Sequence, residues 1–500
     1  MKTNVYIIAF LTAFLFSECS YDSLFQDPAT SLTDETILET KETANTVLMG
    51  AYAWTGDYRY LTIGEISLDV MGNDIKMTDG AHGFSTYNWL MFAYNYVQYP
   101  RIVDGWWSAY ATYLWTYAYK AIDQCNLIIT NADKLPAGCE DIVAQAYGIR
   151  GYNYLNLYHL FCASYTHAGP NGQGLFLRLT PGSAEGNDVV RSPLGVSMQR
   201  IIDDFTYAYE HCTQTSNYFI NSQNAALLLA RTYLDMGDYD NAQHYAEIAC
   251  TVFDGSNLMS KDEYQSGFNT ANSEWLWGFN FVSETSNIYA SIPSFYHAAT
   301  FKDESSVFGT SGYGSQTTYD YVEANSVDWM KGYSTVRVTW SFANMFGAND
   351  CRALFPFYIA DNDGLFTSKY SSKGSLGIAD YPMCRMAEAY LIEAECLARS
   401  GDPDALTVLN ALQIKREGTV STSISVDEVW NERRRELYGE GFALPDIKRL
   451  QKPLTRVGAE HWSEVKNLPA NSPRMMFPIP DDELNYNKNA TAADQNEYWR

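Results

Sequence analysis

The sequence lacks the short motifs that mark metal and nucleophile chemistry. Its seven histidines show no HExxH pair and no Cys/His zinc spacing, and neither a GxSxG elbow nor a P-loop is present. These absences exclude the common zinc hydrolases, serine hydrolases and P-loop nucleotidases. We therefore expect no metal, no cofactor and no catalytic residue of these classes.

Positive charge is also scarce. The 34 Lys and Arg residues are outnumbered by 59 Asp and Glu, which gives a formal net charge of −25 and a pI of about 4.6. Proteins that bind a phosphate backbone need clustered positive charge, so nucleic acid is not an expected partner.

The only long apolar run stands at the start of the chain. Residues 5–16 are largely apolar and follow a single lysine, Lys2, and this run is too short to span a membrane. It is typical of a secretory signal, which we assign to residues 1–18. The following "LFSEC" resembles a bacterial lipobox with a lipid-bearing Cys19, although Glu18 replaces the usual small residue. A soluble exported protein with an incidental cysteine is the alternative.

Paired cysteines are missing as well. None of the nine forms a CxxC pair, and Cys250, Cys384 and Cys396 lie within helical patterns, where cysteine behaves as a small buried hydrophobe. An exported protein can form disulfides, but this spacing does not require them.

Helical periodicity dominates what is present. After a tether at residues 19–40, long helical patterns cover residues 42–55, 106–129 and 142–161. The last two flank a break at Pro136 and Gly138, which predicts a helical hairpin.

Two later segments share one plan. Residues 222–251 and 384–417 each read as a helix, a Gly-Asp break and a second helix; Ala242, Ala246 and Ala249 form a small-residue face in the first segment. Both resemble degenerate tetratricopeptide repeats, which bury a face by stacking on a neighbour. The predicted fold is mostly α, a tetratricopeptide-like helical repeat scaffold.

The segment at residues 256–380 has a different composition. Gly, Ser, Asn, Asp and Tyr dominate, and helical periodicity is absent; residues 64–104 are similar on a smaller scale. A long irregular segment inside a compact domain usually forms a functional surface. We therefore predict a large loop-rich insertion that carries ligand-binding loops at both places.

Aromatic side chains in these loops are the candidate site. A sugar ring offers an apolar C–H face surrounded by hydroxyls, so its site needs flat aromatic platforms beside polar hydrogen-bonding groups. The candidate platforms are Trp89, Tyr96, Tyr296, Tyr313 and Trp329. The alternative is that each ring belongs to the core of the loop region. Three other tryptophans, in apolar surroundings, are assigned to the core: Trp115, Trp275 and Trp277.

The stretch "NERRRELYGEGFALPDIKRL" at residues 431–450 concentrates charge of both signs. Residues three apart on a helix are neighbours, so Glu432 can pair with Arg435 and Arg433 with Glu436. Interleaved signs are typical of a solvated or self-paired helix. The stretch is therefore interpreted as part of the frame and not as a basic patch.

With these motifs the chain resembles the SusD/RagB family of Bacteroidetes outer-membrane lipoproteins. The similar stretches include "YGIRGYNYLNLYHLF", "LLLARTYLDMGDYDNA", "YPMCRMAEAYLIEAECLARSGD", "NERRRELYGEGFALPDIKRL", "FPIPDDELNYN" and "QNEYW", in the family's order. "PDIKRL" departs from the family's aromatic-rich form. The resemblance implies a SusD-like domain over residues 41–500, exposed at the cell outer membrane through a lipid anchor. It also implies that the protein holds oligosaccharide or polysaccharide for a SusC-like TonB-dependent transporter. Ligand sites vary within the family, so no ligand residue is transferred.

Two other functions stay open. A glycoside hydrolase needs only two acids at a fixed separation, and the many Asp and Glu residues supply such pairs. A repeat scaffold that binds only protein is the third interpretation, and the export signal and aromatic loops count against it. Within the resembled family, a non-glycan nutrient such as a peptide is a further alternative.

Overall fold

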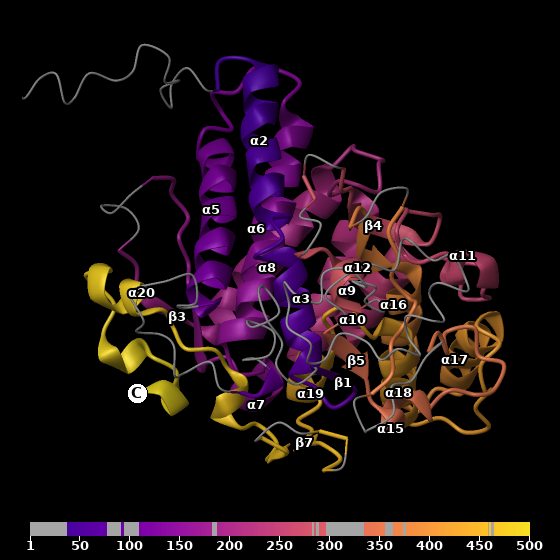
Figure 1. The fold of residues 1–500 in the computed structure, drawn as a ribbon. Helices are drawn as coiled ribbons and strands as arrows, with labels where there is room; N and C mark the ends of the chain where they lie inside the picture. Colours follow the sequence, from indigo (N-terminus) through magenta and orange to yellow (C-terminus); the bar gives the residue numbers. More distant parts are fainter. Residues whose placement is uncertain are drawn as a thin grey trace, which may run out of the picture.

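The computed structural model describes residues 38–77, 92–94, 110–182, 188–282, 285–286, 290–296, 335–355, 364–373, 377–458, 460–461 and 465–500. These residues form a mostly helical body with a few short strands (Figure 1). The predicted signal peptide, Cys19 and most of the tether lie outside the described ranges. The mostly α fold class is confirmed.

The N-terminal part of the body is built from long helices. Helix α2 (Lys41–Thr55) begins at the capping box of Thr40 and Thr43 and packs on α5 (Tyr110–Thr130) and α6 (Glu140–Phe161). The predicted hairpin of α5 and α6 is confirmed, and Figure 1 shows the three helices side by side. No described helix combines the length and apolar character that a membrane crossing requires.

The first predicted repeat is two packed helices, α9 (Ser222–Met236) and α10 (Tyr239–Ala249). Helix α9 ends where Gly237 adopts φ 75°, a left-handed conformation that glycine reaches without a steric cost. The alanine face of α10 is fully buried between α9 and α16, as the small side chains predict.

The second predicted repeat follows the same plan with α16 (Met386–Ser400) and α17 (Asp404–Lys415). Gly401 ends α16 at φ 77°, and the Asp402 carboxylate accepts the Asp404 backbone N–H at 2.9 Å. Contacts then run without interruption from α6 through α8 (Leu194–His211), α9 and α10 to α16. The body is therefore a stack of helices.

The described residues form four antiparallel two-stranded ladders, and two of these join segments far apart in the chain. Strand β1 (Ile75–Met77) pairs with β5 (Val336–Val338), in register Ile75 with Val338, and β4 (Trp275–Phe279) pairs with β6 (Tyr381–Arg385). Because β1 lies in one predicted loop region and β5 in the other, the fold brings the two regions together.

The remaining elements are short. They are α7 (Tyr165–Ala168), β2 (Gln173–Phe176), β3 (Arg191–Pro193), α11 (Lys261–Gln265), α12 (Ile292–Tyr296), α15 (Trp340–Ala343), α19 (Ala443–Arg449), β7 (Leu454–Thr455), β8 (Asn467–Leu468) and α20 (Asp481–Tyr486). Helix α18 (Val426–Leu437) packs on α16 and carries the charged stretch.

The interpretation of residues 64–104 as loops is partly wrong. Helix α3 (Leu61–Val70) reaches into this region, and all ten of its residues are buried. A helix surrounded by protein needs no polar face, so its sequence shows no helical period to recognise. Short helices and strands also interrupt residues 256–380, among them α11, β4 and β5.

The three cysteines predicted to be buried within helices, Cys250, Cys384 and Cys396, are buried, but only one of them lies within a helix. Cys384 lies in β6 and Cys250 follows the end of α10, whereas Cys396 is within α16. Burial raises the pKa of the Cys384 thiol to about 12. The eight cysteines in the described ranges form no disulfide.

Candidate functional site

The charged stretch was predicted to form a solvated or self-paired helix, and its central charges are paired inside the protein rather than solvated. Glu432, Arg433 and Glu436 of α18 are at most 2% exposed. The predicted pair of Glu432 with Arg435 forms at 2.5 Å, but Arg433 pairs with Asp446 of α19 at 2.9 Å instead of with Glu436. The packing of α18 against other elements supplies partners that the helix alone could not provide.

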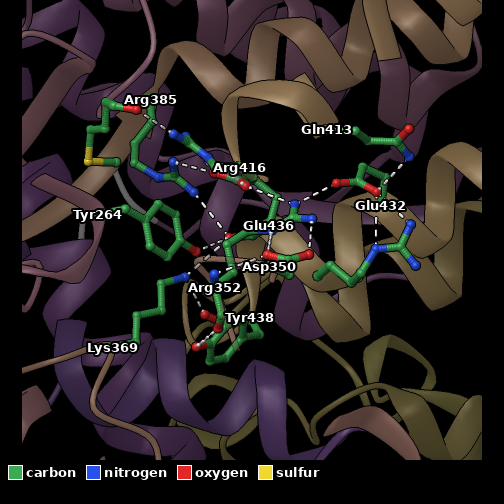
Figure 2. A network of polar contacts seen from close by, with 12 residues as sticks. Tyr264, Asp350, Arg352, Lys369, Arg385, Gln413, Arg416, Glu432, Glu436 and Tyr438 are labelled. Carbon is green, nitrogen blue, oxygen red and sulfur yellow. Dashed lines mark hydrogen bonds and ion pairs between the residues drawn. The ribbon is translucent and has the colours of Figure 1, made fainter. Parts of the chain in front are cut away.

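Glu436 is the centre of a buried network of ion pairs (Figure 2). Its carboxylate lies 3.1 Å from Arg352, 3.0 Å from Arg385 and 2.9 Å from Arg416. Burial by itself would raise the pKa of Glu436, but the three guanidinium groups hold it well below its usual value. Glu274 accepts from two of them, Arg385 and Arg416.

This network joins elements rather than offering a surface. Arg352 follows α15, Arg385 ends β6, Arg416 follows α17 and Glu436 belongs to α18. Each of these four side chains is at most 1% exposed. The charged stretch is therefore part of the frame, as predicted, although by buried pairing and not by a solvated face.

Two further buried carboxyls lie beside this frame, on α3. Burial, followed by the nearby charge of Asp69, raises the pKa of Glu65 to about 8. Burial also raises the pKa of Asp69 to about 7, although its carboxylate accepts hydrogen bonds from the Gly441 and Ala443 N–H groups. The cavity that Glu65 lines with Tyr152, Arg231 and Glu440 has a volume of about 30 Å³. That is room for one water and not for a sugar ring.

The raised pKa of Glu65 predicts that stability falls as pH rises. Between about pH 4.5 and 8 the folded state keeps the Glu65 proton, whereas the unfolded state has lost it. The contribution of this proton to the free energy of unfolding is therefore complete below pH 4.5 and is lost as the pH rises through 8. We expect Glu65→Gln to remove about 2–4 kcal/mol of the decline in unfolding free energy between pH 5 and 8. Urea denaturation at both pH values measures this.

The control for this prediction is Glu210→Gln, which changes an exposed glutamate near the end of α8. Its pH profile should match that of the unaltered protein. Other groups titrate in this range, but they are common to both proteins. A Glu65→Gln profile parallel to the unaltered one would show that Glu65 is ionised in the folded protein throughout.

The aromatic residues predicted as sugar platforms fall into two groups. Trp89, Tyr96, Tyr313 and Trp329 lie outside the described residues, so their roles stay predictions. Tyr296 is described and fully buried in α12, with its ring centroid 5.2 Å from that of Tyr370. It offers no face to a ligand and belongs to the core.

The three tryptophans assigned to the core are confirmed there. Trp115, Trp275 and Trp277 are at most 5% exposed. The Trp277 ring packs edge-on against Tyr152 at 5.0 Å between centroids. For these three tryptophans, apolar neighbours in the sequence correctly predicted a position in the core.

A cleft of about 620 Å³, here called the α5 cleft, opens in the described part of the chain. One wall is the face of α5 from Thr112 to Asn126, and the others are the segment around Arg178 and the C-terminal residues 480–488, which include α20. Figure 1 shows α20 beside α5, although the two are more than 350 residues apart in sequence.

Glu483 fixes the C-terminal wall of the α5 cleft. Its carboxylate accepts from Arg178 at 2.6 Å and from the Trp115 indole N–H at 3.2 Å. The Asn487 side chain donates to Glu483 at 2.8 Å and to the Val189 carbonyl at 2.9 Å. These contacts hold α20 in place before any ligand arrives, so the cleft is preformed.

The α5 cleft was missed by sequence reasoning. A weak signal exists, because Thr112, Thr116 and Asp123 recur at helical spacing on α5. Nothing in the sequence, however, places residues 480–488 against that face. Elsewhere in the described ranges, no group of three or more His, Cys, Asp or Glu side chains could hold a metal ion.

Two family models match the chain. One, described as "SusD family", matches residues 357–499, and the other, described as "Starch-binding associating with outer membrane", matches residues 28–234. A related protein, SusD-like protein P2 of Formosa agariphila, is 26% identical over 418 residues, which are 75% of this chain and 78% of its own.

Solved structures share the fold. A SusD-like carbohydrate binding protein from Bacteroides vulgatus superposes with a TM-score of 0.73 at 22% identity, over 91% of this chain and 98% of its own. A laminarin binding SusD-like protein superposes with a TM-score of 0.68 at 18% identity, over 92% and 99%. These structures show the shared fold, and the two family models confirm the resemblance recognised in the sequence.

Proposed function

We infer, because two SusD-type family models match this chain, that it is a glycan-binding protein of the outer membrane. The observation that carries the inference is the match of two family models, one at each end of the chain, together with a helical body that superposes on carbohydrate-binding structures of this family. The name of the laminarin-binding neighbour supports a polysaccharide or oligosaccharide as the ligand.

In this proposal the protein is a surface-exposed lipoprotein that delivers oligosaccharides to a TonB-dependent, SusC-like transporter. The apolar run at residues 5–16 and Cys19 supply the export signal and the lipid anchor. Both the transporter and the anchor can be tested by isolating the protein from outer membranes. We expect the protein to be isolated together with such a transporter, and Cys19→Ala to abolish its recovery from the membrane. Recovery of the unaltered protein in the soluble fraction would contradict the anchor.

The proposed aromatic platforms predict a loss of binding on truncation. Trp89 and Trp329 lie in the two loop regions that strands β1 and β5 bring together. We expect Trp89→Ala or Trp329→Ala to weaken binding about three- to tenfold, because a stacked ring contributes roughly 0.5–1.5 kcal/mol. Retention in native gels that contain polysaccharide measures the effect, and unchanged mobility of both variants would remove these platforms.

The function proposed here is binding without chemistry, and a hydrolase is the competing function. Incubation of the purified protein with a panel of polysaccharides separates the two, since a hydrolase releases new reducing ends and a binding protein does not. Product formation would overturn the proposal. A protein-only scaffold would instead bind the transporter and no glycan in the same panel.

A further inference from the structure

We propose that the α5 cleft binds a neutral oligosaccharide, with the ring of Tyr486 as the stacking platform. The proposal rests on the proposed glycan-binding function, and it assigns a site outside the two loop regions that the sequence indicates. The cleft combines an exposed aromatic ring, hydrogen-bonding side chains without protein partners and internally paired charges.

The shape of the α5 cleft suits an extended polymer. Its lining on α5 runs from Thr112 to Asn126, which is about 20 Å along a helix axis. The cleft has a volume of about 620 Å³ along this length, so it is a trough that is longer than one sugar ring. It lies within the usual size range of ligand sites.

Tyr486 provides the apolar face. It is 78% exposed, the highest value among the large hydrophobic side chains of the described residues, and it is the last residue of α20. An exposed ring gains by covering its face, and a sugar offers C–H groups for that contact. Trp54 on the α2 side is half-buried, and Lys120 covers its ring at 4.2 Å.

The polar lining has unused hydrogen-bonding capacity. Thr112, Thr116, Gln124 and Asp482 line the cleft, and in the described structure none of these four side chains makes a hydrogen bond or ion pair to protein. The two hydroxyls and the amide can both donate to and accept from sugar hydroxyls, and the carboxylate can accept from them. Their arrangement beside a ring is the mixture that sugar binding requires.

The charges of the cleft favour a neutral ligand. Arg178 is paired with Glu483 at 2.6 Å, and Lys488 with Asp188 at 3.4 Å, so these cations are already compensated. Lys120 is the remaining cation of the lining, and Asp482 lies in the same cleft. The net charge of −25 also repels polyanions at long range. A sulfated or uronic acid polymer therefore fits less well than a neutral one.

The test measures retardation of the full mature chain in native gels that contain laminarin, amylopectin or alginate. Titration calorimetry then measures the affinity for each polymer that retards the protein. We expect retention by at least one of the two neutral polymers and not by alginate, and binding weakened about three- to tenfold in Tyr486→Ala. Tyr486→Phe, which keeps the ring, should bind like the unaltered protein. Because Tyr486 is so exposed, its truncation should leave the fold intact.

The matched control is Tyr498→Ala, which removes another exposed tyrosine of the C-terminal segment that does not line the cleft. It should leave binding unchanged. Neutral-glycan binding that is equal in Tyr486→Ala and the unaltered protein would overturn this site and leave the proposed function standing. Preferential retention by alginate would overturn the neutral ligand, and absence of binding to all three polymers would count against both site and function.

Discussion

Replacing Glu436 with alanine is expected to cost at least 3–5 kcal/mol of unfolding free energy. The change leaves Arg352, Arg385 and Arg416 buried with fewer negative partners, and each is at most 1% exposed. A charge that has lost its partner in the interior is costly, because water cannot replace the partner. Glu436→Gln, which preserves shape, should lose nearly as much, since the missing quantity is the negative charge.

Urea denaturation at pH 7 measures this prediction, with Asp427→Ala as the control in the same helix. Asp427 pairs with Lys452 at 2.6 Å, but its side chain is 68% exposed. An exposed pair contributes about 0–1 kcal/mol, so the control should be nearly neutral. Similar losses for both variants would show that burial does not distinguish the two ion pairs.

Gly441→Ala is the second substitution for which a large effect is expected, about 2–4 kcal/mol. Gly441 has φ 81°, in the left-handed region that an L side chain rarely adopts. A Cβ atom there would lie 1.8 Å from Glu65 Oε2, so either the buried Glu65 side chain or the 439–441 turn must move. The same movement would break the hydrogen bond from the Gly441 N–H to Asp69.

Thermal unfolding with Gly458→Ala as the control measures this effect. Apart from its chain neighbours, no described residue has a heavy atom within 4 Å of a Cβ built on Gly458. Its substitution should change the midpoint little, whereas Gly441→Ala should lower it by several degrees or prevent accumulation of folded protein. A midpoint unchanged by Gly441→Ala would mean that the turn tolerates a side chain, and that the close approach to Glu65 is not a constraint.

Sequence reasoning succeeded where a helix has one buried face. On α5, Leu114, Ala118 and Ile122 recur at helical spacing, and all three are buried. The breaks at Gly237 and Gly401 were also predictable, because left-handed helix ends favour glycine. These features depend only on residues near each other in the chain.

The same reasoning failed where burial is complete or partners are remote. Helix α3 has no exposed face and therefore no period. Tyr296 was placed among ligand platforms because it lies in a long segment rich in Ser, Asn, Asp and Gly, yet its neighbour in space is Tyr370. Arg433 was paired within its helix, whereas the fold offers Asp446.

The sequence by itself determined the helical body, its main turns and its resemblance to the SusD/RagB family, because periodicity, caps and motif order are properties of neighbouring residues. Only the tertiary structure decided which charges are buried and which rings reach water. It also formed the α5 cleft, by setting α20 against α5 through Glu483 and Arg178. The physical reason is that burial and ion pairing depend on distances in space between segments hundreds of residues apart, and no local pattern records those distances.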